Sequence, residues 1–135
     1  MTSWIFISNP NRFRMDDWLA VNQYIEFIQN NNVQVGDIIY LYTTAPVQRI
    51  EYKLIVDKVN IPYEYGIDDS EYSLDPDAHN ANRGKILCRF KMLKRVESSS
   101  LHLSVLREYG LKSSMQGPLK VSGELLDYIE SFFQK

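Results

Sequence analysis

Residues 35–59 constrain the fold more than any other stretch, because they contain two strand patterns joined by a short loop. Gly36-Asp37 interrupts a polar stretch and predicts a turn. Ile38–Thr43 is a run of six β-branched, aromatic or leucine residues, which is typical of a strand covered on both faces. Pro46 cannot donate a hydrogen bond to a β-ladder, so we expect this strand to end just before it.

From Arg49 the pattern changes to alternation, which predicts a strand with one apolar and one polar face. The apolar face would carry Ile50, Tyr52, Leu54 and Val56. The polar face would carry Glu51, Lys53 and Asp57. We expect the rest of the chain to pack on this hairpin or to open around it.

Three further runs predict the elements that precede and follow the hairpin. Ser3–Ser8 has apolar residues on both faces, which is typical of an internal strand. Lys85–Arg95 alternates and predicts a second long strand. A first helix is expected to begin at Asp16 or Asp17 and to end at the asparagines of residues 30–32. Its apolar residues at helical spacing are Trp18, Val21, Ile25 and Ile28.

Two more helices are expected near the C-terminus. One would span Leu101–Tyr109, with Ser100 as its cap and Gly110 directly after it. The other would follow the cap residue Ser122. Its apolar stripe would consist of Leu125, Leu126, Ile129, Phe132 and Phe133.

Two segments lack a clear period and are expected to be loops, namely residues 61–84 and 112–121. A loop as long as the first is usually functional or mobile. The resulting order of elements, β-α-β-β-loop-β-α-α, predicts one α+β domain over residues 1–135. We expect a small curved sheet or barrel flanked by three helices.

Charged residues are segregated along the chain, although the net charge is only −2. The acidic group is Glu64, Asp68, Asp69, Glu71, Asp75 and Asp77. The basic group that follows is Arg83, Lys85, Arg89, Lys91, Lys94 and Arg95. Two interpretations fit this pattern. One is a solvated loop followed by a solvated strand face, and the other is a basic stripe for a polyanion with the acidic loop at a distance.

No catalytic constellation is evident. His79 and His102 have no cysteine or carboxylate at ligand spacing, so we expect no metal and no cofactor. Cys88 lies on the apolar side of its strand, where a buried and inert thiol is expected.

The chain has no signal-peptide pattern and no apolar run of about 20 residues. We therefore expect a cytoplasmic protein that is not an enzyme and does not enter a membrane.

The aromatic content is high, with nine Tyr, six Phe and two Trp. Aromatic residues near element ends are Trp4, Phe6, Trp18 and Tyr42, and the small polar residues beside them are Ser8, Asn9, Thr43 and Thr44. If Ser3–Ser8 pairs with Ile38–Thr43, these groups would meet at one rim. Aromatic stacking and polar side chains of this kind can hold a planar base and read its edge. The alternative is that these aromatic residues belong to the ordinary core.

The motifs and their order resemble the EVE domain of the PUA-like superfamily. In the first half they are Trp4 followed by Ser8-Asn9-Pro10, Gly36-Asp37-Ile38-Ile39-Tyr40-Leu41-Tyr42, Pro46, Arg49-Ile50 and Tyr52-Lys53. In the second half they are Leu106-Arg107-Glu108-Tyr109-Gly110-Leu111, Met115-Gln116-Gly117-Pro118 and Glu124-Leu125-Leu126-Asp127-Tyr128-Ile129. The resemblance spans nearly the whole chain and covers the acidic loop least.

This resemblance implies a compact β-barrel with flanking helices, related to YTH and ASCH domains. It implies that the domain binds nucleic acid, DNA or RNA, and accepts a modified base, such as a methylated cytosine or adenine, in an aromatic pocket. By position, the pocket residues would be Ser8, Asn9, Pro10, Trp18, Tyr42, Thr43 and Thr44. Many EVE proteins have Ser-Glu-Pro at the first three of these positions. An amide in place of the carboxylate changes which base edge can be read.

On this hypothesis, basic side chains near the pocket would neutralise phosphates, so that affinity falls with salt. These are Arg49, Lys53, Arg89 and Lys91. Three alternatives remain: a module for single-stranded RNA that needs no modification, a hydrolase acting on a small nucleotide, and an interaction module. In the last case the apolar face of residues 125–133 would form an oligomer contact. We otherwise expect a monomer or a weak oligomer.

Overall fold

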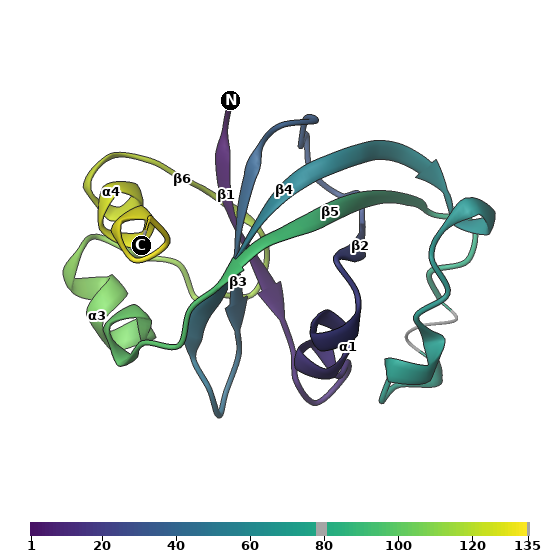
Figure 1. The fold of residues 1–135 in the computed structure, drawn as a ribbon, viewed down its shortest axis with the longest axis horizontal. Coiled ribbons are helices and arrows are strands. Elements are labelled where there is room, and N and C mark those ends of the chain that lie inside the picture. The colour runs from purple at the N-terminus through teal and green to yellow at the C-terminus, as the bar shows by residue number, and fades with distance from the viewer. Residues whose placement is uncertain (78–80, 135) are drawn as a thin grey trace.

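The structure is a computed structural model that describes residues 1–77 and 81–134, so that His79 lies outside the described residues. The described residues form one six-stranded sheet with the strand order β2-β5-β4-β3-β1-β6 (Figure 1). In chain order the strands are β1 (Ser3–Ser8), β2 (Tyr24–Ile28), β3 (Ile38–Thr43), β4 (Arg49–Pro62), β5 (Ile86–Arg95) and β6 (Leu119–Val121). β1 and β3 are parallel: Ser3 pairs with Ile38, and the register continues without a break until Ser8 pairs with Thr43. All other neighbouring strands in the sheet are antiparallel.

Helices cover both faces of this curved sheet (Figure 1). In the described residues they are α1 (Met15–Val21), α3 (Leu103–Glu108) and α4 (Gly123–Ser131). Short 3-10 turns are η1 (Tyr63–Tyr65), η2 (Ser70–Tyr72) and η3 (Ser99–Leu101). α3 and α4 lie on one side of the sheet, and α1 and the η1–η2 segment lie on the other. The predicted α+β fold of a curved sheet with three helices is confirmed. None of the helices in the described part of the chain is long and apolar enough to cross a membrane.

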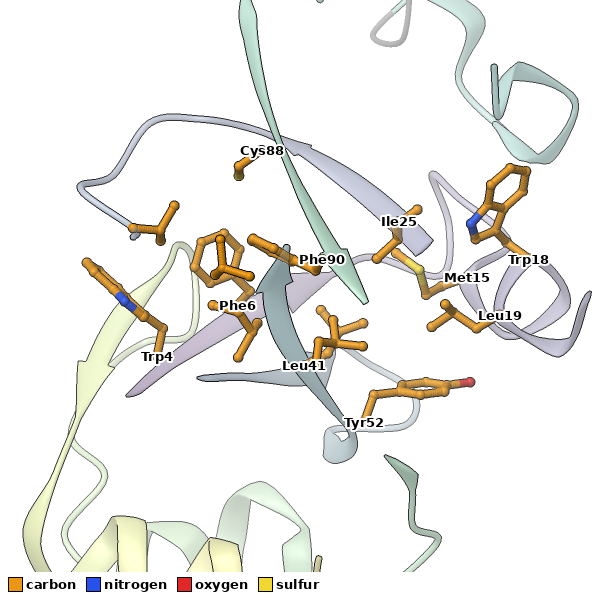
Figure 2. Close-up of a cluster of buried hydrophobic side chains, with 14 residues drawn as sticks. Trp4, Phe6, Met15, Trp18, Leu19, Ile25, Leu41, Tyr52, Cys88 and Phe90 are labelled. Carbon is orange, nitrogen blue, oxygen red and sulfur yellow. The ribbon is translucent and has the colours of Figure 1, made fainter. Parts of the chain in front are cut away.

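The sheet separates two apolar cores, because both faces of its central strands are buried. The core on the α1 side includes Trp4, Phe6, Leu41, Leu54 and Phe90. The core on the α3–α4 side includes Ile5, Tyr40, Ile50, Leu106 and Ile129. In the first core the ring of Phe90 lies edge-to-face on Phe6, with centroids 5.1 Å apart (Figure 2). Phe90 also stacks on Phe27, with centroids 5.5 Å apart. Burial on both faces confirms that β1 is an internal strand.

A β-bulge interrupts the hairpin of β3 and β4. Leu41 pairs with Tyr52 but Tyr42 pairs with Ile50, so Glu51 is the extra residue on β4. The extra residue reverses the alternation, and Ile50 lies in the α3–α4 core while Tyr52 lies in the α1 core. The prediction that Ile50 shares one face with the later apolar residues of β4 was therefore wrong. Glu51 is buried and forms an ion pair with Arg49 at 3.0 Å.

The first helix is shorter than predicted. It ends at Val21, whose side chain is 72% exposed, and the backbone is extended at the next residue. Ile25 and Ile28 belong to β2, which pairs with β5. Tertiary pairing with a long neighbouring strand overrides the helical spacing here, because residues 24–28 are also good strand formers.

The C-terminal elements also differ in detail from the prediction. Residues 119–121, predicted as loop, form β6 and pair with the outer edge of β1. α3 begins at Leu103 because the ring nitrogen Nδ1 of His102 accepts the N–H of Ser104 at 3.1 Å, and the predicted cap Ser100 lies in η3. Ser122 does precede α4 as expected, but its side chain makes no capping hydrogen bond.

Candidate functional site

A cavity of about 870 Å³ lies at the C-terminal end of β1. Segments far apart in the chain line it: parts of residues 6–15, most of the β2 strand, parts of the segment 63–75 after β4, and residues 115–118. Its apolar lining includes Phe6, Phe13, Phe27 and Tyr63, and its uncharged polar lining includes Ser8, Asn9, Thr44 and Gln116. This volume falls within the range of about 300–1,000 Å³ that is usual for ligand sites.

The parallel pairing of β1 and β3 brings the polar edge of the cavity together. The carbonyl of Ser8 accepts the N–H of Thr44 at 3.0 Å, which continues the pairing beyond the end of β1. The chain then turns, because the carbonyl of Asn9 accepts the N–H groups of Arg12 at 3.0 Å and Phe13 at 3.2 Å. Ser8, Asn9 and Thr44 therefore lie at one end of the sheet, all on the cavity lining.

The side-chain amide of Asn9 is held in one orientation. Its Oδ1 accepts the backbone N–H of Asn11 at 2.9 Å. Its Nδ2 has no hydrogen-bond partner among residues 1–77 and 81–134. The amide can therefore donate hydrogen bonds to an acceptor on a molecule in the cavity.

The acidic segment, residues 63–75, is docked against residues 9–14, the loop that precedes α1. The N–H of Arg14 donates to the carbonyl of Tyr72 at 2.8 Å, and the N–H of Leu74 donates to the carbonyl of Arg12 at 2.7 Å. The guanidinium of Arg14 also lies over the Tyr72 ring, 4.8 Å from its centroid. These contacts make the segment a wall of the cavity. It therefore lines the same cavity as Ser8 and Asn9.

A buried carboxylate fixes the other end of this wall. Glu26 on β2 has a side chain only 4% exposed and pairs with Arg89 on β5 at 2.9 Å. Its Oε1 accepts the backbone N–H of Ile67 at 2.5 Å. Gly66 fits closely here, since a Cβ at this position would lie 2.6 Å from Cδ1 of Leu87 and 2.9 Å from Oε1 of Glu26.

We therefore expect Gly66→Ala to disturb the wall. The added methyl group forces either Leu87 or the segment itself to move, at a cost of about 1–3 kcal/mol in unfolding free energy. Urea denaturation measures the loss, and limited proteolysis measures exposure of residues 63–75. Gly117→Ala is the matched control, because Gly117 also lines the cavity but a Cβ there meets nothing within 4 Å. Equal behaviour of the two variants would contradict the steric argument.

The other predicted pocket residues lie away from the cavity lining. Trp18 is buried at the α1 end of the core (Figure 2). Its indole N–H donates to the carbonyl of Tyr24 at 2.7 Å, and its ring lies edge-to-face with the ring of Phe13. Tyr42 is buried in the α3–α4 core, where burial raises the pKa of its hydroxyl. Pro10 and Thr43 do not line the cavity. The structure thus brings Ser8, Asn9 and Thr44 together and leaves the four others outside.

Three of the four basic residues predicted to contact phosphates are engaged in ion pairs. Arg49 pairs with Glu51 at 3.0 Å, and Lys53 pairs with Glu130 at 2.5 Å. Arg89 pairs with the buried Glu26. Neither these residues nor Lys91 lines the cavity. Sequence reasoning missed Arg12, which does line it.

No protein-family model matches this chain, and no curated protein matches it. Solved structures match it over nearly their whole length. ASCH from Zymomonas mobilis is 12% identical with a TM-score of 0.68, and the match covers 96% of this chain and 94% of that chain. The fold is PUA-like. The similarity to ASCH thus confirms, at the level of the fold, the PUA-like architecture that the EVE resemblance implies.

Other structures with the PUA-like fold match equally well. Human THYN1, solved in complex with DNA containing 5-methylcytosine, is 12% identical with a TM-score of 0.67, and the match covers 100% of this chain and 99% of that chain. Rpa0253 from Rhodopseudomonas palustris is 13% identical with a TM-score of 0.66 and coverage of 98% and 92%. Each of these matches extends over nearly the whole of both chains.

Proposed function

We propose that this PUA-like domain binds nucleic acid and holds a single base, methylated or not, in the cavity at the end of β1. One observation carries the proposal. Aromatic rings and hydrogen-bonding side chains line the same cavity, which has the volume of a ligand site. The complex of human THYN1 with methylcytosine-containing DNA, in a domain of the same fold and length, supports this choice of ligand.

The lining matches the chemistry of a base. Stacking on an aromatic ring contributes about 1–3 kcal/mol per base, and Phe13 and Tyr63 offer such rings. The amide of Asn9 and the hydroxyl of Thr44 can form hydrogen bonds with the donors and acceptors on the edge of the base. A base must leave its stack to enter, which costs a few kcal/mol, and less when the base is unpaired. We therefore expect single strands to bind more tightly than duplexes.

A methyl group on the base would add apolar contact. Burial of one such group contributes about 0.8 kcal/mol, which corresponds to roughly a fourfold increase in affinity. Phe6 and Phe27 provide the apolar surface in the cavity. We propose that methylation is a preference of this size and that the domain binds without catalysis. Burial raises the pKa of the Cys88 thiol to about 12, which makes it a poor nucleophile at neutral pH.

Fluorescence anisotropy with labelled oligonucleotides tests the proposal. Matched single strands of DNA and RNA, with cytosine or 5-methylcytosine at one position, are titrated with the protein. We expect Asn9→Ala and Thr44→Val each to reduce affinity about fivefold, the equivalent of a hydrogen bond of roughly 1 kcal/mol. Asn31→Ala serves as control, because Asn31 does not line the cavity. Absence of binding to every oligonucleotide, or full affinity of the Asn9→Ala/Thr44→Val double variant, would contradict the proposal.

A further inference from the structure

The charged side chains that line the cavity are acidic, with one exception among the described residues. Its carboxylates belong to Glu26, Glu64, Asp68, Asp69 and Asp75. Its one cation in the described part of the chain is Arg12. Two like charges 4 Å apart repel each other by about 1 kcal/mol in water and by about 4 kcal/mol near a protein surface. Glu26 pairs with Arg89, so the acidic charge of the lining lies mainly on residues 64–75, whereas a phosphate beside Arg12 meets the opposite charge.

Arg12 occupies a fixed place between this wall and the polar edge of the cavity. Its backbone N–H donates to the carbonyl of Asn9 at 3.0 Å, and its carbonyl accepts the N–H of Leu74 at 2.7 Å. The residue is exposed, and its side chain forms no ion pair with any residue in 1–77 or 81–134. The backbone is thus held from both sides while the guanidinium has access to solvent.

The neighbouring arginine has a different role. Arg14 pairs with Asp17 at 3.6 Å and donates to the carbonyl of Glu71 at 3.1 Å. Its guanidinium also lies over the ring of Tyr72. These contacts hold the Arg14 side chain against the acidic segment. Arg14 does not line the cavity. Of the two arginines in this loop, only Arg12 combines exposure with a position on the lining.

We propose that Arg12 binds the phosphate of the nucleotide whose base occupies the cavity. A guanidinium can donate two parallel hydrogen bonds to phosphate oxygens, which fixes orientation as well as charge. Asn9 and Arg12 lie in one turn, so a base edge and its own phosphate would be recognised by the same short loop. The nucleic-acid backbone would then cross the protein over residues 9–12 and stay clear of residues 63–75. This inference rests on the proposed function.

The salt dependence of binding tests it. Each phosphate contact contributes about 0.7 to the slope of log K against log salt for a single strand, and about 0.9 for a duplex. Arg12→Gln is expected to lower that slope by about one such contact and to weaken binding most at low salt. Arg12→Lys keeps the charge and should retain the slope while losing part of the affinity. Arg107→Gln is the matched control, since Arg107 is exposed on α3, on the opposite side of the sheet.

The outcomes separate this inference from the proposed function. A wild-type protein that binds, with an unchanged slope in Arg12→Gln, would overturn the role of Arg12 and leave base binding intact. An equal fall in slope for Arg107→Gln would show that net charge alone is responsible, and would also overturn it. No binding by the wild-type protein would overturn both. A fall in slope by about one contact in Arg12→Gln only, with the slope kept in Arg12→Lys, is the result we expect.

Discussion

Phe90→Ala is expected to lower the free energy of unfolding by about 3–5 kcal/mol. Phe90 is fully buried at the centre of β5 and packs against both Phe6 and Phe27. Removing the ring leaves a void that these rigid neighbours can fill only in part. Since a domain of this size is stable by about 5–15 kcal/mol, the loss is a large share of the total. Urea denaturation followed by tryptophan fluorescence measures it.

Leu93→Ala is the matched control for this prediction. Leu93 lies on the same strand but is 48% exposed, so its truncation should change the unfolding free energy by about 0.5 kcal/mol or less. Because Phe6 and Phe27 also line the cavity, Phe90→Ala should weaken nucleic-acid binding as well. A loss below about 1 kcal/mol, or equal losses in the two variants, would contradict the placement of Phe90 in the core.

Asp37 is expected to give the second large effect. It is buried just before β3, and its carboxylate accepts the N–H of Thr2 at 2.9 Å, the N–H of Gln34 at 3.0 Å and the indole N–H of Trp4 at 3.1 Å. These bonds tie the start of β1 to the start of β3. Each buried donor left without a partner costs about 1–3 kcal/mol. Asp37→Asn places an N–H₂ group against these donors and should therefore cost at least about 2 kcal/mol.

The same carboxylate makes stability depend on pH. Burial alone would raise the pKa of Asp37, but the hydrogen bonds from Thr2, Gln34 and Trp4 outweigh it and lower the pKa below its ordinary value. A group with a lowered folded-state pKa contributes stability above its unfolded pKa of about 4, and that stability is lost as pH falls through the folded value. We expect the wild-type protein to lose this contribution in acid.

Urea denaturation at a series of pH values between about 5 and 2 checks the pH effect. The unfolding free energy of Asp37→Asn should fall less steeply with decreasing pH than that of the wild-type protein. Asp57→Asn is the control, because Asp57 is exposed on β4. Parallel curves for wild type and Asp37→Asn would show that Asp37 contributes nothing to acid sensitivity.

The long strands could be predicted from the sequence because their patterns are continuous. Ser3–Ser8 and Ile38–Thr43 match β1 and β3, and the β4 and β5 strands begin within a residue of the prediction. β2 could not be found, because the spacing of its isoleucines also fits a helix and only pairing with β5 decides. The three residues of β6 are too few to carry a pattern. The bulge at Glu51 is likewise invisible to alternation, since it depends on the register with β3.

The grouping of polar residues at the end of β1 followed from the predicted pairing of Ser3–Ser8 with Ile38–Thr43. Parallel strands that pair throughout their length bring their ends together, which places Ser8, Asn9 and Thr44 side by side. The predicted stacking role of Tyr42 depended on which face of β3 met the cavity, and both faces are apolar. The acidic segment is held against the loop before α1 by backbone hydrogen bonds and by the close fit of Gly66. Neither feature produces a periodic pattern in the sequence.

The most direct test of base binding in the cavity is an NMR titration of the ¹⁵N-labelled protein with a single strand that contains one 5-methylcytosine. We expect the side-chain amide signals of Asn9 and Gln116 and the backbone signal of Thr44 to shift as the strand binds, because these groups line the cavity. Signals of α3 and α4 should stay in place. Shifts confined to α3 and α4, with Asn9 and Thr44 unmoved, would contradict the account.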